Sequence, residues 1–180
     1  MRLSVQKITE TWQLGDMEDI HVSLLRQAAE DASMTDCPEG RARLVPSPVS
    51  AKDQLREGEF LEDWSEFVTE DLENQFAEDV GTLLADLDGL ESYTVEDEPD
   101  EERYRVSIPL DHGMAWFSTL NQARLMLDQR FILHPQGQEF EPHPDPDTVN
   151  GLDFSERFTA YMRYEFYAVV QEWLVKEVLV

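Results

Sequence analysis

An apolar residue recurs at every third or fourth position from Phe60 to Leu87, over about seven helical turns. This spacing predicts one long amphipathic helix over about residues 60–88. Ten large side chains share its apolar face: Phe60, Trp64, Phe67, Val68, Leu72, Phe76, Val80, Leu83, Leu84 and Leu87. Gly81 lies inside the helix and costs about 1 kcal/mol relative to alanine, which the burial of these side chains offsets.

Similar patterns predict three more helices, near 16–32, 112–132 and 153–178, which Asp16, Asp111 and Asp153 begin. Alternating residues in 2–8 and 103–109 predict two strands that pair with each other. The expected fold class is therefore mainly α: a single domain over residues 1–180, built as a bundle of about four helices with a short two-stranded antiparallel β ribbon. Its core is expected to include Trp64, Phe76, Trp116, Leu120, Phe158 and Trp173.

Three segments are expected to be irregular. Prolines interrupt residues 33–52 and 134–151, so the second is expected to be a Pro-rich loop. The charge run within 92–102 predicts a solvated, mobile acidic linker.

The net charge of −25 disfavours partners that are themselves anionic. Nucleic acid phosphates and anionic membranes are therefore excluded as partners. Cys37 is the only cysteine, so no internal disulfide can form. The first residues lack the apolar stretch of a signal peptide, and no stretch is long enough to span a bilayer. We therefore expect a cytoplasmic protein.

The acidic residues are unevenly distributed, because 19 of them and no basic residue lie between Arg56 and Arg103. Glu62, Glu66 and Glu70 follow one another at four-residue spacing and repel along one ridge of the long helix. One interpretation is a face that keeps the protein in solution. The other is a docking face for a basic protein partner, whose binding relieves the repulsion.

Motifs that carry common chemistries are missing: no phosphate-binding glycine-rich loop, nucleophile elbow or zinc motif occurs. Glu18 and His21 form a single Glu-x-x-His, which we interpret as a capping acid and a surface histidine, because di-iron bundles need that motif twice. The loop around His143 offers oxygen and nitrogen ligands without the pattern of a calcium loop. We therefore predict no metal, no cofactor and no catalytic residue.

A row of polar residues flanks the apolar stripe of the helix at 112–132. It contains Asn121, Arg124 and Asp128, and Glu165 and Glu172 are the polar positions of the last helix. A buried Arg124 needs a carboxylate, so we expect an ion pair with Glu165 or Glu172, shielded from water. The alternative is a ligand-binding or catalytic pocket around Asn121, Arg124 and Glu165.

The last helix is apolar around much of its circumference, with Tyr161, Phe166, Trp173 and Leu174 among its large residues. Such a helix is either enclosed by its own chain or placed at the seam of a twofold homodimer.

Several stretches resemble an uncharacterised bacterial family, a domain of unknown function best represented in actinobacteria. These stretches are His21–Gln27, Asp63–Phe67, Ile108–Asp111, Trp116–Leu125 and Glu172–Val175. The resemblance implies a small helical cytoplasmic protein with no known activity and no catalytic residues to carry over. Genes of that family often lie beside the adaptor of the Clp protease, which implies a link to regulated proteolysis.

Two hypotheses follow. The leading one is a protein–protein interaction module or accessory factor that docks through its acidic helix. The alternative is an enzyme or small-ligand binder with a polar pocket around Asn121, Arg124 and Glu165.

Overall fold

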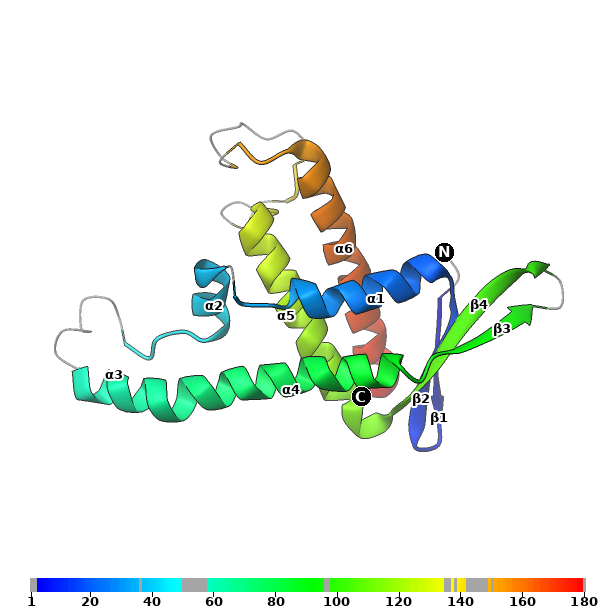
Figure 1. The fold of residues 1–180 in the computed structure, drawn as a ribbon, viewed down its shortest axis with the longest axis horizontal. Helices are drawn as coiled ribbons and strands as arrows, with labels where there is room; N and C mark the ends of the chain where they lie inside the picture. The colour runs from blue at the N-terminus through cyan, green and yellow to red at the C-terminus, as the bar shows by residue number, and fades with distance from the viewer. Residues whose placement is uncertain are drawn as a thin grey trace.

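The structure is a computed structural model that describes residues 3–35, 37–49, 58–95, 98–134, 137, 139–141, 149 and 151–179. Its strands are β1 (Ser4–Ile8), β2 (Thr11–Met17), β3 (Glu91–Val95) and β4 (Glu98–Pro109). Its α-helices are α1 (Asp19–Asp31), α2 (Pro38–Leu44), α3 (Gly58–Trp64), α4 (Glu70–Leu87), α5 (Gly113–Phe131) and α6 (Phe154–Trp173). Two π-helical turns, η1 (Ser65–Thr69) and η4 (Leu174–Val178), and one 3₁₀ turn, η2 (Leu110–His112), complete the described elements. The fold is mainly helical with an antiparallel sheet (Figure 1).

The sheet has four strands in the order β1-β2-β4-β3, so the predicted two-stranded ribbon is wrong. β1 pairs with β2 through a tight hairpin, and β4 lies between β2 and β3. β2 is not among the predicted strands, because the helix expected near 16–32 begins at Asp16, which lies inside this strand. The hairpin also lacks the Asn-Gly or Asp-Gly pair that marks most two-residue turns, and Thr9 has a positive φ of 46° instead.

The first helix begins at Asp19, later than predicted, because Asp16 belongs to β2. The register of β2 against β4 shifts between Leu14 and Met17, and Asp16 has a φ of 55° at this bulge. Asp111 is also not a helix cap, since it lies in η2 before α5. Asp153 was predicted correctly: its carboxylate accepts a hydrogen bond from the N–H of Ser155 at 2.8 Å. The irregular stretch 33–52 contains the short helix α2, with Pro38 at its first position.

The acidic segment 92–102, which we interpreted as a linker, lies mostly in β3 and β4. Two arginines on β4 form ion pairs with acidic residues of β3 and of β4 itself and with the acidic residue before α1. Arg105 forms an ion pair with Glu91 at 2.9 Å, and Arg103 bridges Glu18 and Glu101. Pairing of this kind lets a chain so rich in carboxylates adopt a strand. Of the Pro-rich segment 134–151, most lies outside the described residues.

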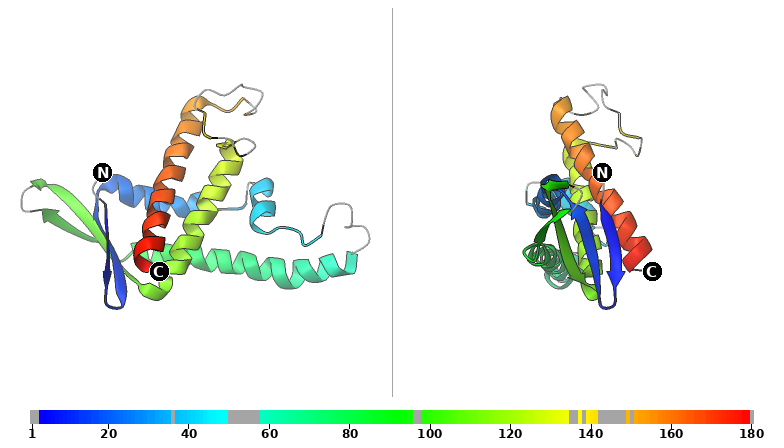
Figure 2. Two further views of the ribbon diagram at one scale, coloured as in Figure 1. Left: turned by 180° about the vertical axis from the view of Figure 1, so that it is seen from behind. Right: turned by 90° about the vertical axis from the view of Figure 1, so that its right-hand side faces the viewer.

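The long helix is confirmed: α3, η1 and α4 form one continuous rod over residues 58–87. In Figure 1 only its C-terminal part crosses the rest of the molecule, and its N-terminal part extends past α5 and α6. Figure 2 shows the same projection from behind. We call residues 58–76 the projecting helix.

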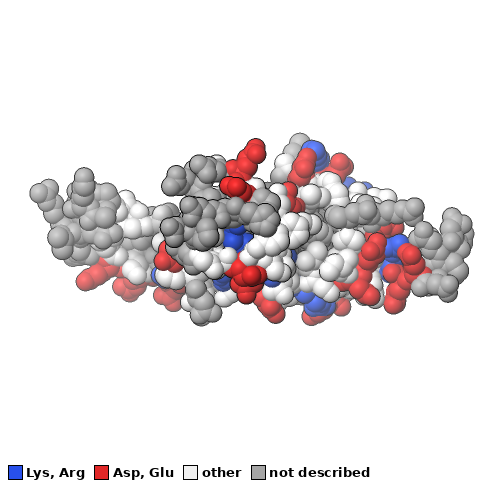
Figure 3. All heavy atoms as spheres, turned by 90° about the horizontal axis from the view of Figure 1, so that it is seen from above, with Lys and Arg blue, Asp and Glu red and all other residues white. Residues whose placement is uncertain are grey.

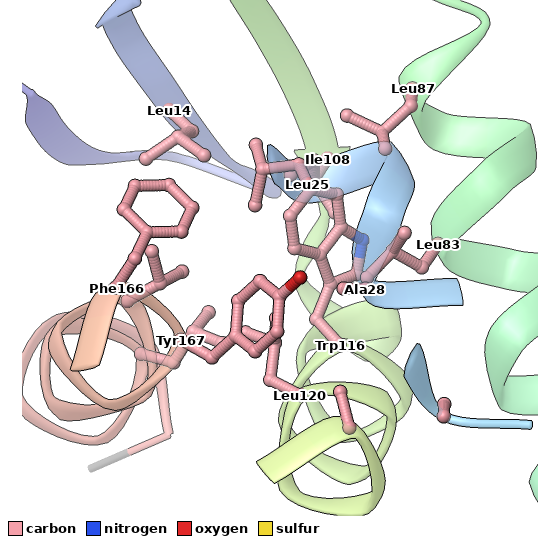
Figure 4. Packing of buried hydrophobic residues seen from close by; sticks show 14 of the residues in the cluster. Leu14, Leu25, Ala28, Leu83, Leu87, Ile108, Trp116, Leu120, Phe166 and Tyr167 are labelled. Carbon is pink, nitrogen blue, oxygen red and sulfur yellow. The ribbon is translucent and has the colours of Figure 1, made fainter. Parts of the chain in front are cut away.

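The core lies between the sheet, α1, α5, α6 and the C-terminal end of α4 (Figure 4). Trp12 of β2 and Trp116 of α5 meet edge to face, with ring centroids 5.2 Å apart. Trp116 and Leu120 are fully buried, as predicted. Phe158 is 43% exposed and so lies outside the core, while Trp64, Phe76 and Trp173 are only partly buried.

α1 is joined to α6 by a buried carboxylate at its last residue. Asp31 accepts a hydrogen bond from the hydroxyl of Tyr167 at 2.8 Å and pairs with Arg163 at 3.2 Å. Burial nevertheless raises the pKa of the Asp31 carboxyl, because desolvation outweighs these two partners.

The end of α5 is held by a buried arginine from α6. Arg157 donates to the backbone carbonyls of Phe131, Ile132 and Glu141 at 3.0–3.1 Å and is 1% exposed. Ile132 ends the helix with a φ of 49°, a conformation that β-branched residues rarely adopt. A guanidinium group at this position satisfies carbonyls that the helix leaves unpaired and interacts favourably with the helix dipole.

Replacing Arg157 by leucine is expected to destabilise the fold by about 3 kcal/mol or more, since hydrogen bonds to charged groups contribute about 1.5–3 kcal/mol each. The stability of Arg157→Lys should lie between those of the wild type and Arg157→Leu, because one ammonium group cannot reach three carbonyls in the same geometry. Arg41→Ala, at an exposed ion pair, serves as the control and should change little. Urea unfolding of the variants measures the differences, and a wild-type midpoint for Arg157→Leu would contradict the assignment.

Candidate functional site

The acidic ridge, which we define as Glu62, Glu66 and Glu70, lies on the projecting helix. All three side chains are exposed, and among the described residues none of them has a basic partner. Glu73 of the same helix, by contrast, is paired with Arg41. In Figure 3, seen from above, acidic side chains recur along the lower edge of the molecule. Within the described part of the chain, the ridge is therefore a row of unpaired negative charges on a part of the molecule that extends away from the core.

Two aromatic residues of the projecting helix are also exposed. Phe60 is 47% exposed and Phe67 is 62% exposed, while Trp64 is half-buried beside Phe60, with ring centroids 6.3 Å apart. We expected the whole apolar face of this helix to be buried, and that expectation is wrong here. Burial is complete only at the other end of the long helix, where Leu83 and Leu87 are completely buried.

Arg124 does not pair with a carboxylate of the described chain. Its guanidinium donates to Oε1 of Gln171 at 2.7 Å and to the hydroxyl of Tyr164 at 2.9 Å, and it lies 4.4 Å from the centre of the Tyr164 ring. Glu165 and Glu172 are both exposed, so the predicted ion pair is wrong. Asn121 is half-buried like Arg124, whereas Glu165 is exposed. The pocket around these three residues stays a prediction.

A polar cavity instead lies beyond Tyr164, at the end of α5. We define it by its described lining residues, which enclose about 490 Å³: Arg43, Asp128, Gln129, Ile132, His134, Gly137 and Tyr164. Asp128 holds three donors: its carboxylate accepts from Arg43, from the backbone N–H of His134 and from Nδ1 of the same histidine, each at 3.0 Å. The ring of His134 packs on Tyr164, with centroids 4.8 Å apart.

This arrangement fixes the tautomer of a neutral His134. An ionised carboxylate only accepts hydrogen bonds, so Nδ1 carries the proton and Nε2 presents its lone pair. Nε2 has no hydrogen-bond partner within the described part of the chain. It could accept a proton or a hydrogen bond from a bound molecule. We had noted Asp128 only as the end of a polar row, and His134 and Tyr164 gave no signal without the fold.

Glu18 and His21 serve the start of α1. The backbone N–H of Glu18 donates to Nδ1 of His21 at 3.0 Å, and the Glu18 carboxylate pairs with Arg103. The capping interpretation is confirmed, but His21 is 4% exposed and stacks on Phe166, so it is not a surface histidine. Within the described ranges, no group of three or more His, Cys, Asp or Glu residues is placed to hold a metal ion. His143 lies outside those ranges.

The buried histidine makes stability depend on pH. Burial lowers the pKa of His21 below its ordinary value of 6.5, and this outweighs the opposite effect of Glu18. Below about pH 6.5 the unfolded chain therefore binds a proton that the folded protein does not, so this contribution to stability is lost as the pH falls.

We expect the free energy of unfolding to decrease between pH 7.5 and pH 5.5 by more in the wild type than in His21→Gln. Glutamine can still accept the hydrogen bond from Glu18 but does not titrate. All carboxylates are common to both proteins, so the difference between the two pH profiles isolates His21. Parallel profiles from urea titrations would show that folding leaves the pKa of His21 unchanged, which would contradict this prediction.

The last helix is only partly enclosed by the rest of the described chain. Leu174 is completely buried, but Phe158 and Met162, on the first half of α6, are 43% and 53% exposed. A homodimer through this helix remains a prediction. No helix of the described residues is long and apolar enough to cross a membrane.

The fold and these surfaces define a mainly helical domain with a small antiparallel sheet and an acidic projecting helix. The family model of a domain of unknown function, DUF2017, matches residues 7–178, so the chain belongs to this family. No curated protein and no solved structure matches the chain.

Proposed function

We propose that this protein is a protein–protein interaction module that binds a basic partner through the projecting helix. The observation that carries the proposal is the acidic ridge: three exposed carboxylates in a row, without a basic partner among the described residues. Each like-charge pair at four-residue spacing destabilises the free helix by about 0.2–0.5 kcal/mol. A partner that brings lysine or arginine side chains removes this repulsion and adds attraction.

The exposed aromatic residues distinguish docking from simple solubility. A face that only keeps a protein in solution needs charge and gains nothing from exposed rings. Phe60 and Phe67 lie on the same helix as the ridge and offer apolar area that a partner can bury. A role as an accessory factor in regulated proteolysis is part of the proposal, and its support is the family resemblance alone.

Reversing the ridge with Glu62→Lys, Glu66→Lys and Glu70→Lys is expected to abolish capture of the partner and leave the fold intact, because these side chains are exposed. The matched control reverses three exposed acids elsewhere, Glu10, Glu139 and Glu177, so that both variants have the same net charge. Immobilised wild type and both variants are incubated with native cytosol, and the captured partner is then titrated in purified form at rising salt.

The partner should bind the wild type and the control variant, and its binding should weaken with salt because exposed charges are screened beyond about 8 Å at physiological ionic strength. A partner that binds the reversed ridge as tightly as the wild type would sink the proposal. Salt-independent binding would do the same.

A second candidate function is the binding of a small polar molecule in the polar cavity. The observation that favours it is the Asp128–His134 pair, which holds an imidazole nitrogen available at the wall of a space of about 490 Å³. If the cavity were an active site, His134, oriented by Asp128, would be its general base, since that role needs the same available nitrogen at the cavity wall.

Fragments that bind the cavity are expected to raise the melting temperature of the wild type but not that of His134→Gln. His112→Gln is the matched control, because His112 also contacts a carboxylate, Asp86, at 3.0 Å but does not line the cavity. Thermal-shift screening of a fragment library against the three proteins measures the effect. Fragments that stabilise all three equally bind elsewhere, and the candidate would then fail.

A further inference from the structure

An apolar groove lies beside the acidic ridge, between α4 and the end of α1. We define the groove by its lining: Ala29, Ala32, Ser33, Met34, Glu73, Phe76, Ala77, Val80 and Gln122. It is hollow because three of these residues are alanines, and it is open because Ala77 is exposed and Met34, Phe76 and Val80 are half-buried. Its volume is about 250 Å³. An apolar cavity of about 150 Å³ already holds a benzene molecule, so the groove has room for one large apolar side chain.

The groove continues the acidic ridge along the same helix. From Glu70, steps of three and four residues lead to Glu73 and Ala77, both of which line the groove. Positions spaced in this way lie on one face of a helix, so a single ligand can contact the ridge and the groove together. The distance from Glu62 to Ala77 is about 22 Å along the helix axis, at 1.5 Å for each residue.

The charge of this face selects among possible occupants. A second copy of the chain would carry a net charge of −25 and an identical ridge, so its approach is repelled. A partner segment that carries acidic residues beside its apolar side chain is also repelled by the ridge. A segment that carries lysine or arginine beside its apolar residue meets complementary charge at Glu70 and complementary surface in the groove.

The geometry points to an anchor site: we infer that the groove binds one large apolar side chain of a basic amphipathic helix whose lysine or arginine residues contact the acidic ridge. This inference rests on the proposed function and specifies the class of partner. A helix of about 15 residues is long enough to cover Glu62 to Ala77. Its side chains repeat at the same three- and four-residue spacing as the ridge, which lets two helices lie side by side with matched contacts.

Two designed 18-residue peptides test the anchor. The first is a lysine-rich amphipathic helix with leucine at the anchor position, and the second has glutamine in its place. Fluorescence anisotropy measures the binding of each to the wild type, to Ala77→Trp and to Ala85→Trp. The first variant fills the groove from an exposed position, and the second adds the same bulk at an exposed position on α4 outside the groove.

The leucine peptide is expected to bind the wild type and Ala85→Trp about tenfold or more tightly than the glutamine peptide, because the groove buries the leucine. Ala77→Trp should remove this difference and leave the glutamine peptide unaffected. In the wild type, methyl signals of Met34 and Val80 should shift with the leucine peptide only, which tests the groove without any substitution.

The outcomes separate the two proposals. One outcome is that both peptides bind equally to the wild type, Ala77→Trp and Ala85→Trp, while the variant with the reversed ridge binds neither. In that case the ridge docks a basic partner and the anchor site is overturned. If Ala77→Trp folds but keeps the tenfold difference, the anchor site is again overturned. If neither peptide binds the wild type, the proposed function fails, and the anchor site fails with it.

Discussion

Trp116 connects three parts of the molecule, and its contacts determine which end of the long helix is fixed. Its ring packs edge to face on Trp12 of the sheet, and its Nε1–H donates to Asp86 near the end of α4 at 2.8 Å. Asp86 also contacts His112 at 3.0 Å, at the start of α5. One buried side chain thus joins the sheet, α4 and α5, because an indole offers both a large apolar surface and a single polar donor.

The long helix projects because it is fixed to the core near its C-terminal end, and its length adds to the projection. Residues 58–87 extend about 45 Å, whereas a compact domain of this size has a diameter of about 40 Å. Length alone therefore carries the helix about 5 Å past such a domain, and the position of the fixed end accounts for the rest. The acidic residues lie on the free part, where a row of like charges is solvated and costs least. The position of the acidic ridge thus follows from the architecture.

The sequence predicted the elements with strong periodicity and missed the contacts that depend on the angle around a helix. The long helix, α5 and the cap at Asp153 were found, since each has a local signal. β2 was missed because a bulge at Asp16 and a hairpin without a turn motif hide its alternation. Charge pairing alone then suggested the wrong partners for Arg124. Its true partners, Tyr164 and Gln171, each precede the predicted acid by one residue, which turns the contact by about 100° around α6.

Three arginines of the fold bind oxygens that carry no charge. Arg157 donates to three backbone carbonyls, and Arg130 donates to the carbonyls of Asp31 and Ser33. Arg124 donates to an amide and a hydroxyl. The hydrogen bonds of these three arginines thus go to neutral oxygens. A guanidinium group is planar and has five N–H donors, so it can bind two or three such acceptors at once. The sequence has only 14 lysine and arginine residues against 39 acids, and Glu73 of the projecting helix is paired with Arg41. Glu62, Glu66 and Glu70 have no basic partner among the described residues, and this is the observation that supports the proposed binding of a basic partner.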